Sequence, residues 1–199
     1  HPGVNANAQS LAIGKFAAGF GFPGPNGDGA ITIANHADFA IPAGSGFTAE
    51  AFVNAGSSDA AIPRVILNKG QLNAAGTLTA AGWSLTVGSF RGIANNVRWS
   101  ISDGNPPIDS FADLNLADGK FHHVAGVIDQ FARLTRLFVD GVQHGSADIT
   151  GLGALTNAEL IRIGRSATGH SLTGVIDEVR FSRVVRAEFQ PVLGEGDDA

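Results

Sequence analysis

The sequence predicts an all-β fold in which two antiparallel sheets pack as a jelly-roll sandwich. Apolar and polar residues alternate in many short segments, and about twelve strand candidates fall between residues 16 and 190. No segment keeps the apolar period of an α-helix for longer than about two turns. Turn residues separate the segments, and 27 of the 199 residues are glycine. Many short strands without helices favour a sandwich.

Strict alternation identifies the strands one by one. In residues 47–53 the apolar side chains of Phe47, Ala49, Ala51 and Val53 share one face. Three further segments alternate in the same way: residues 83–87, 97–101 and 160–163. Such segments are typical of strands with one buried face.

Aromatic residues and turn residues refine this assignment. Trp83 and Trp99 have apolar neighbours two positions away, so we expect them in the core rather than on a sugar-binding surface. Asp140-Gly141 lies between two apolar segments. This pair predicts a two-residue hairpin, because a type I′ turn needs two residues with positive φ.

The composition argues against several classes of function. The net charge is −5, which disfavours nucleic acid as a partner because phosphate contacts need clustered Lys and Arg. No Cys is present, which leaves no disulfide and no thiolate chemistry. The longest apolar runs are about five or six residues, too short to insert across a membrane.

Several motifs occur in the order typical of one family. Residues 47–53 (FTAEAFV) resemble the FTIEAWV strand of the laminin-G-like, concanavalin-A-like jelly-roll modules. Residues 118–125 (DGKFHHVA), 134–141 (LTRLFVDG) and 174–181 (GVIDEVRF) are similar to later strands of the same modules. The resemblance covers about residues 16–190. We expect residues 1–15 to be an N-terminal arm or linker and residues 191–199 to be an acidic tail.

The resemblance implies a non-catalytic recognition module of bacterial type, secreted or on the cell surface. It would bind a glycan or a protein ligand, or act in adhesion, often with a structural calcium ion. Two alternatives stay open. The chain could be a structural subunit that self-assembles into a homo-oligomer or a filament, or it could be an enzyme that acts on glycans. Because fold does not fix function, these expectations are analogies.

Calcium would need carboxylate and carbonyl oxygens. Asp177 has the parity of Val175 and Val179, so we expect it at the core-side edge of its strand, where a carboxylate needs a partner. Asp28 lies in a Gly-rich loop that could complete a calcium site with Asp177. The alternative is that Asp177 accepts hydrogen bonds in a turn.

By strand parity, Glu50 and Arg180 are expected on one sheet face. The resemblance implies that their two strands lie close together, so we expect a structural ion pair between these residues. The sequence shows no catalytic residue, because glycoside hydrolysis needs paired carboxylates. The chain has five Glu residues, and no two lie four or five apart on one strand. We therefore predict that the protein is not an enzyme.

A polar ligand-binding rim is predicted where four residues gather at a loop–strand junction: Arg91, Asn95, Asn96 and Arg98. The histidines give weaker indications of a metal site. Adjacent His122 and His123 have opposite parity, so they cannot share one metal and are expected to be structural. His1 could chelate copper through its amine and imidazole if exposed at a chain terminus, but the sequence marks no second histidine as its partner.

Overall fold

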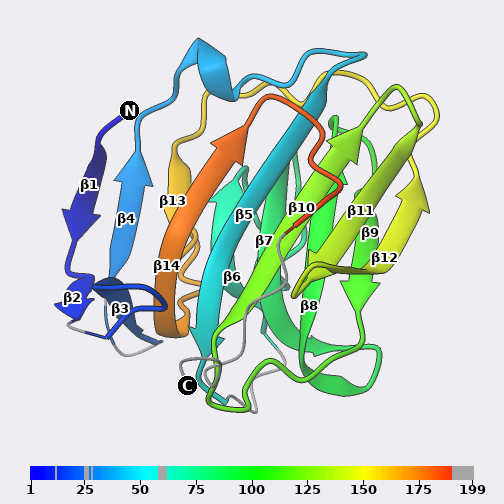
Figure 1. The fold of residues 1–199 in the computed structure, drawn as a ribbon. Coiled ribbons are helices and arrows are strands. Elements are labelled where there is room, and N and C mark those ends of the chain that lie inside the picture. Colours follow the sequence, from blue (N-terminus) through cyan, green and yellow to red (C-terminus); the bar gives the residue numbers. More distant parts are fainter. Residues whose placement is uncertain (12, 25–26, 28, 58–61, 190–199) are drawn as a thin grey trace.

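Fourteen strands form two antiparallel seven-stranded sheets in the computed structural model, which describes residues 1–11, 13–24, 27, 29–57 and 62–189. The sheets pack face to face as a sandwich (Figure 1). Twelve of the strands, β3 to β14, lie within residues 16–190. The predicted fold class is confirmed.

The two sheets are defined by their strand order. Sheet A contains, in spatial order, β1 (Gly3–Ala6), β4 (Ala30–Ile33), β13 (Ile161–Ile163), β6 (Arg64–Lys69), β7 (Gly82–Phe90), β8 (Ile93–Ser102) and β9 (Ile108–Ala112). Sheet B contains β12 (Val142–Asp148), β11 (Leu134–Val139), β10 (His122–Asp129), β5 (Gly46–Ala55), β14 (Thr173–Ser182), β3 (Gly19–Pro23) and β2 (Gln9–Leu11). A single 3₁₀ turn among the described residues, η1 (Ala37–Phe39), follows β4.

Alternating residues of both sheets fill the core between them. The predicted apolar face of β5 is buried throughout, as are Trp83 and Trp99. The two indole rings lie 5.7 Å apart between their centroids. Gly126 of β10 makes room for Trp99, because a Cβ atom at this position would overlap the indole ring. Trp99 Nε1 also donates to Thr135 Oγ1 at 2.8 Å, which satisfies its buried polar atom.

The hairpin between β11 and β12 has the predicted turn. Asp140 has a φ of 50° and Gly141 a φ of 79°. Two consecutive positive φ values are the signature of a type I′ turn, whose twist matches the strands that it joins.

The N-terminal residues are strands rather than an arm. β1 pairs with β4 in sheet A, and β2 pairs with β3 in sheet B. All four residues of β1 are exposed, so backbone hydrogen bonds rather than apolar burial hold it in place. This pattern explains why hydrophobic periodicity gave no strand here. The predicted acidic tail, residues 191–199, lies outside the described residues.

A bulge in β14 changes the predicted face of Asp177. Asp177 pairs with Phe52 and Arg180 with Glu50, so two residues of β14 stand opposite one residue of β5. Glu178, at the bulge, has a φ of 50°. The extra residue reverses the parity of the strand. Asp177 therefore shares the outer face with Phe52 and Glu50, and the expected core-side position is wrong.

None of the helical segments in the described part of the chain has the length and apolar character to span a bilayer.

Candidate functional site

The segment that follows β14 crosses the outer face of sheet B. We call residues 183–189 the C-terminal strap; Figure 1 shows it passing over β5 and β10. Thr48 Oγ1 donates to the Val184 carbonyl at 2.9 Å and accepts from the Arg186 N–H at 3.1 Å. Phe189 packs against a small apolar cluster of β10 and β11: Ala125, Val127 and Phe138. These contacts hold the strap above the sheet.

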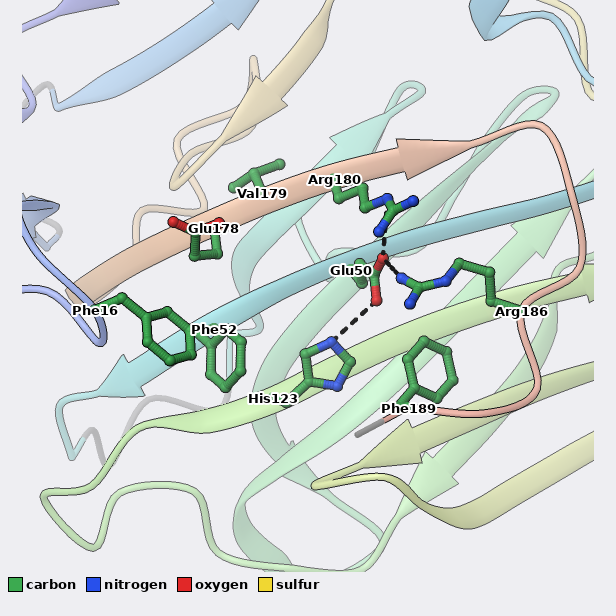
Figure 2. Close-up of a pocket in the computed structure, with 9 residues that line it drawn as sticks. All are labelled: Phe16, Glu50, Phe52, His123, Glu178, Val179, Arg180, Arg186 and Phe189. Carbon is green, nitrogen blue, oxygen red and sulfur yellow. Dashed lines mark hydrogen bonds and ion pairs between the residues drawn. The ribbon is translucent and has the colours of Figure 1, made fainter. Parts of the chain in front are cut away.

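A pocket of about 430 Å³ opens between the strap and sheet B. Five elements supply its walls: β5, β10, β14, the strap and the segment before β3 (Figure 2). Its lining combines three aromatic residues, two arginines, two carboxylates, a histidine and a valine: Phe16, Phe52, Phe189, Arg180, Arg186, Glu50, Glu178, His123 and Val179. The pocket thus combines an aromatic surface with polar groups that converge, as in many ligand sites.

Glu50 is the polar centre of the pocket. Its residue is only 4% exposed. Arg186 Nη1 donates to Oε1, and Arg180 Nε lies 3.7 Å from the same oxygen. His123 Nε2 lies 3.1 Å from Oε2 (Figure 2). A buried carboxylate is stable only when it is paired and hydrogen-bonded, and these three partners meet that requirement.

Burial favours the neutral form of His123. It lowers the pKa of His123, and the Asp140 carboxylate opposes this only in part. A neutral imidazole with its proton on Nε2 would donate to an ionised Glu50, because an ionised carboxylate can only accept. The imidazole lies between two phenyl rings, with centroids 5.0 Å from Phe52 and 5.1 Å from Phe189. His123 therefore orients the carboxylate without adding charge.

Glu50 and His123 are buried, whereas a ligand can reach Arg180 and Phe16. The Arg180 side chain is 63% exposed. Phe16 is 68% exposed and packs edge-on against Phe52, with 5.2 Å between ring centroids. An exposed guanidinium next to aromatic faces offers fixed hydrogen-bond donors and an apolar platform. The buried Glu50 carboxylate is the ion-pair partner on one side of that guanidinium.

Two carboxylates line the pocket, although the sequence analysis found no pair on one strand. Glu50 comes from β5 and Glu178 from the bulge of β14. Figure 2 shows Glu178 towards the Phe16 end and Glu50 between the two arginines. A general acid must carry a proton that it can release. Glu50 instead accepts from an arginine and a neutral histidine, so its environment suits a structural anion.

The predicted polar rim is not an exposed rim. Asn96 is completely buried and joins β7 to β8, since its amide both accepts from the Phe90 N–H and donates to the Phe90 carbonyl at 3.0 Å. Asn95 is 6% exposed and its Oδ1 accepts from Arg64 at 2.9 Å. Arg98 is 7% exposed. This interpretation is corrected for these three residues, because all three are buried. Arg91 alone of the four stays exposed, 3.5 Å from Asp113.

Asp177 has surroundings that do not fit calcium. Its Oδ2 accepts from the backbone N–H groups of Lys15 at 2.8 Å and Phe16 at 3.4 Å. Its Oδ1 accepts from the Glu178 N–H at 2.9 Å. Calcium requires several oxygen ligands, whereas the neighbours here are donors. The hydrogen-bonded alternative fits these contacts. Asp28 lies outside the described residues.

The structure places Glu50 and Arg180 on the same face of neighbouring strands, as parity and the family resemblance together predicted, but Glu50 has two more partners. The sequence predicts a structural role for His123 but does not identify its partner. The structure places His123 on β10, the strand next to that of Glu50. Arg186 and Phe189 lie beyond the last strand, where periodicity carries no signal. The alternation of β5 and β10 was the one available clue, since it places His123 and Glu50 on the same outer face.

Comparison with known proteins supports the fold. A laminin G family model, described as the concanavalin A-like lectin/glucanases superfamily, matches residues 25–188. No curated protein sequence matches the chain.

Three solved structures show the range of similar folds. The binding domain of Paraclostridial Mosquitocidal Protein 1 has a TM-score of 0.72 at 14% identity, over 92% of this chain and 44% of that one. The botulinum neurotoxin serotype D ligand-binding domain in complex with N-acetylneuraminic acid has a TM-score of 0.66 at 14% identity, over 93% and 43%. Domains LG4-5 of the mouse laminin alpha1 chain have a TM-score of 0.60 at 16% identity, over 88% and 41%. The chain thus spans less than half of each.

Proposed function

Since the chain belongs to the concanavalin A-like lectin/glucanases superfamily, we propose that it is a non-catalytic recognition domain that works outside the cell, secreted or on a surface. Its ligand is a glycan, and the binding site is the pocket between sheet B and the C-terminal strap. A protein ligand or a role in adhesion would use the same exposed groups.

The observation that carries this proposal is that the pocket combines a buried carboxylate with an exposed arginine. The buried carboxylate of Glu50 fixes Arg180 and Arg186, while Arg180 remains 63% exposed. Preorganised donors bind hydroxyl or carboxylate groups without losing side-chain entropy at the moment of binding. Phe16 and Phe52 provide the apolar surface that a sugar ring needs on one face.

A similar solved structure supports a glycan as the ligand class. One similar domain is described in complex with N-acetylneuraminic acid, which is a sugar with a carboxylate. Guanidinium groups recognise carboxylates by paired hydrogen bonds. When His123 is neutral, the two Glu and two Arg residues of the pocket give no net formal charge. Both neutral and acidic glycans therefore belong in the test.

The test is a glycan array probed with the full chain and two matched variants. Arg180→Ala removes an exposed guanidinium from the pocket, and Arg91→Ala removes one that is 58% exposed at the predicted rim. We expect the wild type to bind at least one glycan, Arg180→Ala to lose about tenfold or more in affinity, and Arg91→Ala to match the wild type. The array is repeated with added calcium, which should change nothing.

Three outcomes count against the proposal. Loss of binding in Arg91→Ala but not in Arg180→Ala would move the site to the rim. Binding that requires calcium would restore the calcium-dependent interpretation. Absence of binding to every glycan would favour a structural role.

Assembly is a second candidate function because of β1. This strand lies at the edge of sheet A, and all four of its residues are exposed. Edge strands can pair with a strand of another chain. Light scattering after size-exclusion chromatography distinguishes the two functions, since a monomer at high concentration contradicts self-assembly.

A further inference from the structure

A second group of polar side chains lies outside the pocket, near the start of β1. His1, His36 and Asp38 each offer one ligand atom, and these atoms lie within 4.8 Å of one another. His1 precedes β1. His36 is the N-cap residue of η1 and Asp38 lies within η1, which follows β4. Figure 1 shows the N-terminus where β1 begins, beside the end of β4. Pairing of β1 with β4, from Gly3 opposite Ile33, brings these two ends together.

Asp38 Oδ2 lies between the two imidazoles. It is 2.9 Å from His1 Nε2 and 3.2 Å from His36 Nδ1. Ligand atoms that share a metal at about 2.1 Å are themselves about 3 Å apart or slightly more. The two separations from Asp38 therefore already match those of a coordination sphere, and all three ligand atoms lie within 4.8 Å of one another.

We propose that His1, His36 and Asp38 form a binding site for a divalent transition-metal ion of the zinc, nickel and copper group. Two imidazoles and one carboxylate are ligands that these ions accept, whereas calcium and magnesium prefer oxygen alone. All three residues are exposed, so an ion can enter without a change in the fold. Three protein ligands leave at least one coordination position open for water or another molecule.

Metal binding replaces interactions that the cluster makes by itself. His36 Nδ1 accepts from the Asp38 N–H at 3.2 Å, which caps η1. A metal on that nitrogen takes the same lone pair. Asp38 Oδ1 stays free for Arg183, whose Nη1 lies 3.7 Å away. The site therefore joins the residue before β1 to η1, where the His1 ring also lies 5.0 Å from the Phe39 ring between centroids.

A second His–Asp cluster has a similar composition, but its geometry does not suit a single metal ion. His122 Nδ1 lies 2.7 Å from Asp140, and His122 Nε2 lies 3.1 Å from Asp118. The two carboxylates stand on different nitrogens of one ring, so no single point is near all three groups. This cluster is an ion pair network and serves as an internal contrast.

The test measures zinc binding by isothermal titration calorimetry on the metal-free 199-residue chain without an added histidine tag. We expect one zinc ion per chain and a higher melting temperature with zinc, because a ligand that binds only the folded state stabilises it. His36→Asn keeps a side-chain acceptor for the η1 cap but removes the imidazole. It should weaken zinc binding at least about tenfold.

Two further variants complete the design. His1→Asn should lose as much affinity as His36→Asn, and His144→Asn, which removes an exposed histidine of β12, should bind zinc as the wild type does. Melting curves without metal check that each variant folds. The proposal is overturned if zinc does not bind, if His36→Asn and His1→Asn bind normally, or if calcium raises the melting temperature as much as zinc does.

Discussion

The two sheets cover their outer faces in different ways. On sheet A, residues 70–81 fold over the strands, and Leu72 and Leu78 pack on Val65. Arg98 lies beneath this loop, donates to the Gly76 carbonyl and stacks on Phe90 at 4.6 Å. On sheet B, the C-terminal strap covers the sheet with ion pairs and one phenyl ring, and a pocket remains.

The comparison shows what decides whether an outer face becomes a site. Both faces carry an arginine held by an acceptor, yet Arg98 is 7% exposed and the Arg180 side chain is 63% exposed. An arginine that the loop has enclosed stabilises the fold. An arginine that is anchored at one end and open at the other can meet a ligand.

The largest effect is expected from Glu50→Gln on the sheet B side. The substitution removes the charge that Arg186 and Arg180 share, while the shape of the side chain is kept. We expect a loss of about 3 kcal/mol in the free energy of unfolding, near the lower end for a broken buried ion pair. Urea unfolding followed by the fluorescence of the buried Trp83 and Trp99 measures it.

Arg180→Ala is the matched control for this prediction. Its guanidinium is exposed, so its removal should cost less than about 1 kcal/mol. If Glu50→Gln is as mild as Arg180→Ala, the carboxylate is not the centre of the site.

Arg98→Ala should have the next largest effect and should act on stability alone. It removes a buried donor to a carbonyl and the stacking on Phe90, which together are worth about 2 kcal/mol. Burial lowers the pKa of Arg98, with Asp109 opposing the shift. The control is Arg91→Ala, expected within about 0.5 kcal/mol of wild type. Loss of glycan binding in a folded Arg98→Ala variant would contradict the division between the two faces.

Two adjacent histidines should give smaller and opposite pH effects. Hydrogen bonding to Asp140, and less strongly to Asp118, raises the pKa of His122 despite partial burial. Burial lowers the pKa of His123. The stabilisation from His122 is complete below its unfolded value of about 6.5 and is lost as pH rises through the folded pKa. The contribution of His123 is present above that value and is lost as pH falls through the folded pKa.

Melting temperatures at about pH 5.5 and pH 8 separate the two effects. His122→Gln should lower the melting temperature more at the acidic pH. His123→Gln should reduce the loss of stability that the wild type shows on acidification. The assignment fails if both variants change the pH profile in the same direction.

Local patterns predicted most of the fold, because burial and turn geometry are encoded within a few residues. The alternation of residues 47–53 gave the buried face of β5, and Asp140-Gly141 gave the β11–β12 turn. β1 was missed since its exposed residues have no apolar period. The bulge at Glu178 was missed since one extra residue changes parity without a change in composition.

The site was predicted only in part, because its partners come from distant segments. Parity and strand adjacency placed Glu50 near Arg180. Arg186 is 136 residues from Glu50 and reaches it only because the strap turns back over sheet B. In the same way, the burial of Arg98 depends on residues 70–81, which nothing near Arg98 in the sequence reveals.

The smallest expected effect is that of calcium on the sheet B bulge. Asp177 accepts three backbone N–H groups, so adding calcium to the metal-free chain should leave the melting temperature unchanged. Asp177→Ala should instead lower the free energy of unfolding by about 1 to 3 kcal/mol, because it leaves those donors without their acceptor. A calcium-dependent rise that Asp177→Ala abolishes would make this carboxylate a metal ligand. A rise that survives in the variant would place calcium elsewhere, and the outer face of sheet B would still need no metal to hold its pocket open.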